Sequence, residues 1–215
     1  MDFSRQTDLV DIESLETHVT LIGCGGIGSF TALALAKMGC VHLTVYDDDL
    51  VEEHNIPNQL YRPGDVGRPK VECLADIIKG FTGTGIDARP ERVHSQRFQG
   101  IVVSGVDSME ARRRIWDRSI RFKAGVEAYI DARMGAEVSR IYTVRPADPD
   151  HGRFYERTLY SDDEAWQLPC TAQAIVYTGF GIASLVAGQV KRVAMGDTWR
   201  REIIFDQKTL TLFSA

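Results

Sequence analysis

Short apolar runs alternate with an amphipathic segment at the start of the chain. Residues 18–23 (HVTLIG) and 41–46 (VHLTVY) are rich in β-branched positions and predict two buried strands. Between them, residues 26–38 carry apolar side chains near helical spacing, and Gly39 predicts the end of that helix. Three aspartates, Asp47, Asp48 and Asp49, follow the second strand. This order predicts the opening βαβ unit of a Rossmann-like, doubly wound and mostly parallel sheet.

The alternation continues along the rest of the chain. The patterns predict helices over 71–81, 108–122 and 171–195, and strands over 86–88, 101–104, 126–131, 136–144, 202–206 and 209–213. The last two strands flank Asp206-Gln207-Lys208 and predict an added antiparallel hairpin at the end of the sheet. Residues 50–69 predict a functional loop because they are rich in Pro, Gly and Asn, and 145–169 predict a mobile connection.

Composition agrees with a globular α/β protein. The 215 residues are 44% apolar and 26% charged, and no repeat or linker divides them, so we expect a single domain over residues 1–215. The net charge of −5 makes general nucleic-acid binding unexpected. The polar and acidic N-terminus predicts no signal peptide, and the scattered cysteines predict neither a disulfide framework nor structural zinc. The expected location is therefore the cytoplasm.

Two other segments allow alternative interpretations. Residues 171–190 lack charged side chains and are long enough to cross a bilayer, but Gln173, Gln189 and several glycines dilute their hydrophobicity. We therefore predict a buried helix and no membrane association. The five arginines between Arg112 and Arg121 predict a solvated helix face, with a docking surface for an acidic partner as the alternative.

The turn between the first strand and helix carries the clearest candidate chemistry. Gly23-Cys24-Gly25-Gly26-Ile27-Gly28 matches G-x-G-x-x-G, in which the glycines permit a tight turn and let backbone N–H groups approach a phosphate. Asp47 ends the second strand, where a carboxylate can accept hydrogen bonds from ribose hydroxyls. These features predict a nucleotide site and fit NAD and ATP equally well.

Later motifs distinguish the two nucleotides. They are Asn55-Ile56-Pro57-Asn58-Gln59, then Val66-Gly67-Arg68-Pro69-Lys70, then Ser104-Gly105-Val106-Asp107. Phe3-Ser4-Arg5-Gln6 precedes them, and Cys170-Thr171-Ala172-Gln173-Ala174 follows. In this order the motifs resemble the ThiF/MoeB/HesA family, the ubiquitin-activating-enzyme-like adenylyltransferases. The resemblance runs nearly from end to end.

The resemblance implies roles for the matching residues. Gly23, Gly25, Gly26 and Gly28 would hold the phosphates of ATP, Asp47 would bind its ribose, and Asp49, Asn55, Asn58 and Gln59 would complete the binding set. Lys70 would contact the phosphates and offset negative charge in the transition state. Asp107 would bind Mg²⁺, or would cap the helix that follows it. Arg5 would reach into the partner subunit's site as an arginine finger of a homodimer.

Two positions depart from the family pattern. Asn58 stands where the family has arginine, and Arg62 or Arg68 on the same loop could replace that charge. The paired CxxC motifs of many members are also missing, and the five histidines form no HxH or HxxxH pair. Cys170 is the candidate for covalent chemistry through a thioester, with a packing role as the alternative, while Cys24 is interpreted as a small residue of the turn.

The expected activity is ATP-dependent adenylation of a carboxylate. The resemblance implies that the substrate is the C-terminus of a small ubiquitin-fold or sulfur-carrier protein, and that the acyl group can pass to Cys170. Three alternatives stay open, namely an NAD-dependent oxidoreductase, a catalytically weak scaffold, and an adenylase of a peptide or a tRNA base.

Overall fold

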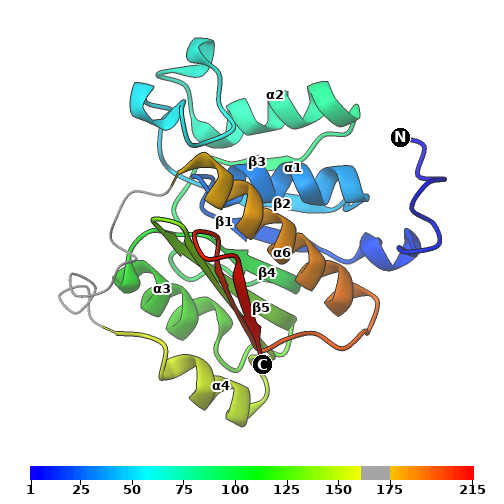
Figure 1. The fold of residues 1–215 in the computed structure, drawn as a ribbon, viewed down its shortest axis with the longest axis vertical. Helices are drawn as coiled ribbons and strands as arrows, with labels where there is room; N and C mark the ends of the chain where they lie inside the picture. The colour runs from blue at the N-terminus through cyan, green and yellow to red at the C-terminus, as the bar shows by residue number, and fades with distance from the viewer. Residues whose placement is uncertain (161–174) are drawn as a thin grey trace.

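One eight-stranded sheet forms the centre of the molecule, in the order β3-β2-β1-β4-β5-β6-β7-β8. The computed structural model describes residues 1–160 and 175–215 (Figure 1). Five strands pair in parallel: β1 (Val19–Ile22), β2 (Leu43–Tyr46), β3 (Asp87–Arg89), β4 (Gly100–Ser104) and β5 (Val126–Gly135). Three more continue the sheet antiparallel: β6 (Val138–Val144), β7 (Glu202–Asp206) and β8 (Thr211–Ser214). The predicted parallel sheet with a closing antiparallel hairpin is confirmed.

Helices cover both faces of this sheet. The apolar core on one face includes residues of α1 (Gly28–Met38), α2 (Lys70–Thr82) and α6 (Val176–Ala194), and the core on the other face includes residues of α3 (Met109–Ile115) and α4 (Pro149–Glu156). Strand β4 shows the alternation directly, because Ile101 and Val103 belong to the first core and Val102 to the second. The described residues also form three short 3₁₀ helices: η1 (Glu13–Glu16), η2 (Glu53–Asn55) and η3 (Pro63–Asp65).

The predicted mobile connection over 145–169 is wrong in its first half, where α4 forms. The carboxylate of Asp148 accepts hydrogen bonds from the backbone N–H groups of Asp150 and His151, and Pro149 occupies the first helical turn. These are ordinary start signals, but the eight-residue helix is too short to establish a clear apolar period. The last residues of the predicted connection lie outside the described part of the chain.

Other elements differ from the prediction mainly in their ends. The helix predicted over 108–122 is shorter, since α3 ends at Ile115 and a π-helical turn, Trp116–Ile120, replaces its second half. Strand β5 continues four residues beyond the predicted end at Asp131, to Gly135. The late helix is α6, which begins at Val176 and ends at Ala194. It packs against α1, β5 and β6, as predicted for a buried helix.

No helix in the described ranges combines the length and the apolar character that a bilayer crossing requires. Within α6, Gln189 is 2% exposed and donates a hydrogen bond to Thr143 Oγ1 at 2.8 Å. A buried amide is therefore satisfied inside the protein.

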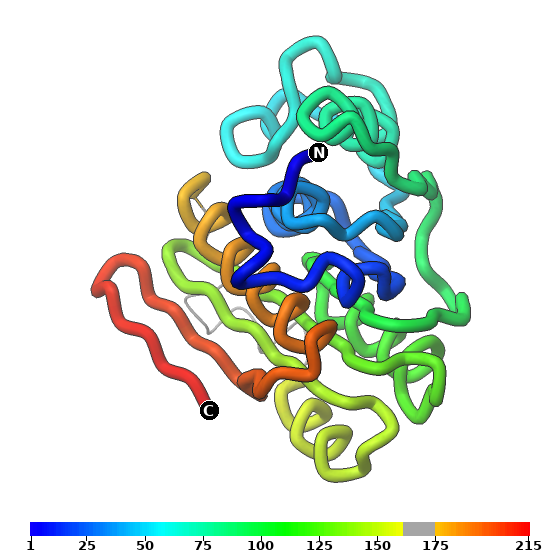
Figure 2. Tube along the Cα trace, turned by 90° about the vertical axis from the view of Figure 1, so that its right-hand side faces the viewer, coloured from blue at the N-terminus to red at the C-terminus, as the bar shows by residue number. Residues whose placement is uncertain are grey.

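Figure 2 shows the β7–β8 hairpin, in red, at one edge of the molecule and the loop before α2, in cyan, at the far end. Strands β1 and β4 lie side by side between these ends, although the chain between them forms α1, β2, α2 and β3. The connection from β3 to β4, residues 90–99, contains no helix. At their carboxyl ends, β1 and β4 bring together loops from both halves of the fold.

Candidate active site

A pocket of about 740 Å³ opens at the carboxyl ends of the parallel strands. It lies between β1 and β4. From this pair the chain builds the sheet outward in two opposite directions, to β2 and β3 on one side and to β5 on the other. Open α/β sheets bind ligands at such a position. Gly23 after β1, Asp47 after β2 and Asp107 after β4 line it, together with Arg133 and Met134 of β5. The pocket therefore joins residues that are far apart in the sequence.

The glycine turn between β1 and α1 forms one wall of the pocket. Gly23 has a left-handed backbone with φ 91°, and a Cβ on Gly28 would lie 1.8 Å from the carbonyl oxygen of Gly23. A Cβ on Gly25 would instead meet nothing closer than the side-chain nitrogen of Gln59, at 3.9 Å. The turn needs glycine at 23 and 28 for its shape, whereas Gly25 leaves open space toward the pocket.

Asp47 ties this turn to the end of β2. Its carboxylate accepts a hydrogen bond from Cys24 N at 2.6 Å and another from Asp49 N at 2.8 Å. Burial raises the pKa of Asp47 above its ordinary value, although the two N–H groups act in the opposite direction. Each carboxylate oxygen has a second lone pair, so Asp47 can hold the turn and still accept a hydrogen bond from a ligand hydroxyl.

Lys70 is the first residue of α2, and its ammonium group reaches the pocket. The residue is only 7% exposed, and its Nζ lies 2.7 Å from Asp49 Oδ2. The loop before it is folded back on itself, because Val51 N donates to Arg68 O at 2.9 Å and Lys70 N donates to Asp49 O at 3.0 Å. The predicted functional loop therefore delivers one buried cation to the site.

Of the three polar residues predicted on this loop, only Gln59 lines the pocket. Asn55 is buried in η2, where its Oδ1 accepts a hydrogen bond from Glu52 N at 2.9 Å. Asn58 Oδ1 and Gln59 Oε1 are buried and have no hydrogen-bond partner in the described residues. A half-turn of either amide would exchange the oxygen for a nitrogen, so these positions can present either an acceptor or a donor.

Neither arginine proposed to replace the charge missing at Asn58 lines the pocket. Arg62 donates two hydrogen bonds to Asp65, both at 3.0 Å. Arg68 donates to Asp76 at 2.8 Å. Both guanidinium groups are therefore committed to carboxylates of their own loop and of α2.

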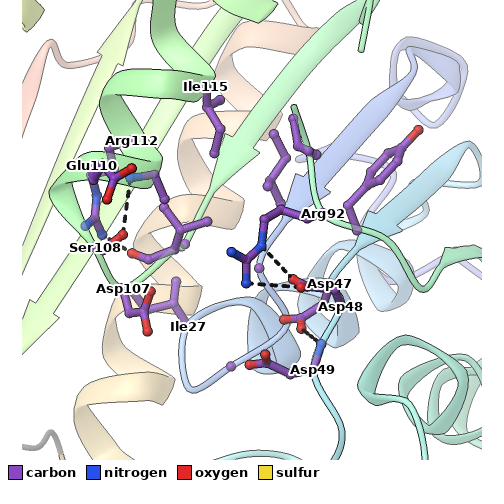
Figure 3. A pocket seen from close by; sticks show the side chains of 18 of the residues that line it. Ile27, Asp47, Asp48, Asp49, Arg92, Asp107, Ser108, Glu110, Arg112 and Ile115 are labelled. Atoms are coloured by element: carbon purple, nitrogen blue, oxygen red, sulfur yellow. Dashed lines mark hydrogen bonds and ion pairs between the residues drawn. The ribbon is translucent and has the colours of Figure 1, made fainter. Parts of the chain in front are cut away.

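Asp107 follows β4 on the opposite side of the pocket, and its carboxylate is exposed. Ser108 caps α3, since its Oγ accepts a hydrogen bond from Ala111 N at 3.1 Å. The capping role considered for Asp107 is thus filled by its neighbour. Figure 3 shows Asp107 and Ser108 facing the aspartates that follow β2 across the pocket, with Ile27 between them.

The acidic side of the pocket includes a cation that the sequence did not point out. Arg92, on the connection between β3 and β4, lies over Asp48 with Nη2–Oδ2 at 3.0 Å (Figure 3). Carboxylate oxygens of Asp47, Asp48 and Asp49 lie within 4.8 Å of one another. Arg92 and Lys70 each balance one member of this acidic group.

A buried ion network behind the pocket was also missed. Asp131 of β5 is fully buried and accepts hydrogen bonds from Arg112 Nε at 3.1 Å, Arg133 Nε at 2.7 Å and Tyr155 Oη at 3.0 Å. Burial acts to raise the pKa of Asp131, but the charges of Arg133 and Arg112 outweigh it and hold this pKa below its ordinary value. Asp131 is therefore a carboxylate that stays ionised in the protein interior.

This network corrects the prediction of a solvated helix face at Arg112, while Arg113, Arg118 and Arg121 are exposed as predicted. Arg112 is 4% exposed and belongs to the core side of α3, whereas its neighbour Arg113 is exposed. Arg112 shares a helix face with the buried residues Met109 and Ile115, but helical spacing could not name the partner of its charge, because Asp131 lies on β5, 19 residues away. The charged run Asp131-Ala132-Arg133 also made the strand appear to end early, although the two charges neutralise each other inside the sheet.

Gly28, Asn55 and Asn58 do not line the pocket, and two further predicted residues lie apart from it or outside the described residues. Arg5 is exposed on the N-terminal segment, whose Gln6 Nε2 donates to Met38 O at 2.7 Å, at the end of α1 remote from the glycine turn. Cys170 lies outside the described part of the chain. Burial raises the pKa of Cys40 to about 12 and also raises those of Cys24 and Cys73, so these three thiols are scarcely ionised at neutral pH.

The sequence profile of the ThiF family matches residues 4–212. The Nedd8-activating enzyme E1 catalytic subunit of Drosophila melanogaster is 32% identical over 121 residues, which are 53% of this chain and 27% of that protein. The SAMP-activating enzyme E1 of Haloferax volcanii is 39% identical over 68 residues, which are 31% of this chain and 25% of that protein. The chain thus spans about a quarter of the length of these relatives.

Solved structures show the same fold. MccB of E. coli, crystallised with AMPCPP and MccA, superposes with a TM-score of 0.73 at 17% identity, covering 95% of this chain and 65% of that one. MccB crystallised with ATP gives a TM-score of 0.72, also at 17% identity and over the same shares of the two chains. At this identity the likeness concerns the fold.

Proposed function

The chain belongs to the ThiF family of adenylyltransferases, and we propose that it uses ATP to adenylate a carboxylate. The observation that carries this proposal is the pocket itself. A glycine turn open at Gly25, the buried cation of Lys70 and the exposed carboxylate of Asp107 surround one cavity large enough for a nucleotide. The loop that ends at Lys70 is one that a dinucleotide site does not need.

The proposed roles follow from the position of each group. The turn from Gly23 to Gly28, with Gly25 and Gly26 at its centre, would lie against the phosphates, and Asp47 would accept a hydrogen bond from the ribose. Lys70, a compact charge already oriented by Asp49, would stabilise the negative charge that develops at the α-phosphorus. Gln59 would offer its amide from the pocket wall, while Asn55 and Asn58 would support the loop that carries it.

The proposed metal is Mg²⁺, and Asp107 would hold it. An exposed carboxylate at the pocket, free of the capping role that Ser108 fills, suits a hard cation that prefers oxygen ligands. When bound, the ion would neutralise phosphate charge.

The proposed substrate is the C-terminal carboxylate of a small ubiquitin-fold or sulfur-carrier protein, or of a peptide. Relatives are named as activating enzymes for Nedd8 and SAMP, and MccB was solved with MccA. A carboxylate oxygen would attack the α-phosphorus of ATP, the bond from that phosphorus to the bridging oxygen would break, and pyrophosphate would leave. The product would be an acyl-adenylate.

We also propose that the acyl group can pass to Cys170. Its thiolate would attack the acyl carbon, form a thioester and release AMP. Support comes from the segment that begins with Cys170 and from the fact that Cys24, Cys40 and Cys73 are buried with raised pKa values. Replacing Cys170 by alanine should remove the thioester and leave adenylate formation intact.

Calorimetry with ATP, AMP and NAD tests the nucleotide assignment. We expect ATP to bind in the presence of Mg²⁺ and NAD to bind much more weakly, because the pocket pairs Lys70 with the glycine turn. Tight NAD binding without ATP binding would refute adenylation and favour an oxidoreductase. If ATP binds, incubation with ATP, Mg²⁺, candidate carrier proteins and hydroxylamine should trap the activated carboxylate as a hydroxamate, whereas a scaffold would give none.

We further propose a homodimer in which Arg5 of one subunit acts at the site of the other. The segment that carries Arg5 is anchored to Met38 at one end of α1, while the glycine turn lies at the other end, so Arg5 is remote from its own pocket. An Arg5→Ala variant and a Lys70→Met variant should each be weakly active, and mixing them should restore part of the activity because one site of a mixed dimer is intact. A fully active monomer in light scattering would contradict this arrangement.

A further inference from the structure

Asp131 combines complete burial with three hydrogen-bond donors. Two of the donors belong to the guanidinium groups of Arg112 and Arg133, which both line the pocket, and the third is Tyr155 Oη. The carboxylate itself does not line the pocket. It lies behind the wall, between β5 and the helices α3 and α4, and connects one strand with both helices.

One arm of this network reaches the segment that carries Asp107. Arg112 uses Nε for Asp131, and its Nη2 donates to the carbonyl oxygens of Val106 and, at 3.4 Å, of Ala132. Val106 directly precedes Asp107. Gly105 N donates to Ile22 O at 2.8 Å, so the segment 105–108 is fixed at its start by β1 and in its middle by Arg112.

The other arm reaches the segment after α4. Arg133 uses Nε for Asp131, and its Nη1 and Nη2 donate to the carbonyl oxygen and the hydroxyl of Thr158, at 2.8 and 3.0 Å. Arg113 adds a hydrogen bond to Leu159 O at 3.3 Å. Tyr160, two residues after Thr158, lines the pocket. Arg133 therefore attaches this part of the pocket wall to the sheet.

Both arms depend on the charge of Asp131. Its Oδ1 accepts from Arg112 and its Oδ2 from Arg133, so a single carboxylate holds two guanidinium groups that would otherwise repel each other. A buried ionic cluster of this kind is costly in desolvation and is no better for stability than well-packed apolar side chains. The desolvation cost of this cluster is offset if the cluster fixes the positions of the two pocket segments that it contacts.

We propose that Asp131 is a positioning residue for the nucleotide site, acting through Arg112 on the Asp107 segment and through Arg133 and Thr158 on Tyr160. The inference rests on the proposed function, in which Asp107 holds the Mg²⁺ that accompanies ATP. It adds a residue that touches no ligand and that defines two walls of the pocket at once.

Hydrogen exchange of the ligand-free protein tests the positioning without any nucleotide. In Asp131→Asn, the amides of Gly105, Thr158 and Leu159 should exchange at least about tenfold faster, whereas those of β1 and β2 should keep their rates. The control is Asp117→Asn, which removes an exposed carboxylate from the π-helical turn and should change none of these rates. Unchanged exchange at all three amides in a folded Asp131→Asn variant would overturn the proposal.

Variants of the single arms keep the test decisive if Asp131→Asn does not fold. Arg112→Lys keeps a cation beside Asp131 but cannot also reach Val106, so only Gly105 should exchange faster. Arg133→Lys likewise keeps a cation beside Asp131 but cannot also reach Thr158, so only Thr158 and Leu159 should exchange faster. If each variant accelerates exchange at Gly105, Thr158 and Leu159 alike, or at none of them, the two arms do not act separately and the proposal fails.

A double-mutant cycle then connects the network to the ligand. The Kd for ATP with Mg²⁺ should rise about tenfold in Asp131→Asn, and the loss of affinity in the Asp131→Asn, Asp107→Asn double variant should be smaller than the product of the two single losses, because one of the two arms acts through Asp107. Additive effects would overturn action through Asp107. A wild-type protein that binds no ATP would refute the proposed function instead. The hydrogen-exchange experiment needs no nucleotide, so it would still test whether Asp131 fixes the two segments.

Discussion

Replacing Lys70 by methionine should lower ATP–pyrophosphate exchange by about 10²–10³-fold, measured with the carboxylate substrate present. Loss of one pre-placed charge at a transition state typically has this effect. Methionine preserves the buried stem of Lys70, which is 7% exposed, and removes only the ammonium group that lies 2.7 Å from Asp49. Asp49 is left exposed to water, so we expect the fold to persist.

The matched control for this variant lies on the same helix. Lys79→Met changes an exposed lysine of α2 that does not line the pocket, and its exchange rate should equal that of the wild type. Asp107→Asn should reduce exchange to a similar extent as Lys70→Met and should raise the Mg²⁺ concentration required. Wild-type exchange in either Lys70→Met or Asp107→Asn would show that the pocket works in another way.

Gly28→Ala should destabilise the protein by about 3 kcal/mol and abolish ATP binding. The new Cβ would lie 1.8 Å from the carbonyl oxygen and 2.9 Å from the carbonyl carbon of Gly23, and two backbone segments cannot yield as a flexible side chain can. The turn must therefore open, and opening it separates β1 from the start of α1 at the pocket wall. Denaturant unfolding and calorimetry with ATP measure the two effects.

Gly25→Ala provides the comparison within the same turn. Its Cβ would meet only the Gln59 side chain, at 3.9 Å, so the free energy of unfolding should change by less than about 0.5 kcal/mol. Gly25 lines the pocket, so we expect the affinity of the Gly25→Ala variant for ATP to differ from that of the wild type. Equal stability of the Gly28→Ala variant and the wild type would contradict the close packing of this turn.

The part of the fold that local patterns determine could be predicted from the sequence. The βαβ start has a β-branched strand, a glycine turn and a helix ended by Gly39, and each signal lies within a few residues of the element it defines. Asp47 could be assigned to the site because it ends the second strand of the βαβ start, and Lys70 and Asp107 because their motifs resemble those of the family; all three line one pocket.

The missed features depend on which charged partner each arginine meets in the fold. The predicted substitutes Arg62 and Arg68 lie close to Asn58 in the chain, but their carboxylate partners direct them away from the pocket. Arg112 appeared to belong to a solvated helix face until β5 supplied Asp131. Electrostatic pairs of this kind follow from tertiary packing, and no periodicity in the sequence reports them.

The strand order has a kinetic consequence. The pairing of β1 with β4 closes the whole chain between Ile22 and Gly100, so forming it carries a larger loop-closure entropy than forming the neighbouring β1–β2 unit. The pocket requires that pair, and a folding intermediate that holds only β1, α1 and β2 would present the glycine turn without Asp107. A nucleotide should then leave early folding steps unchanged and act instead by slowing unfolding of the completed sheet.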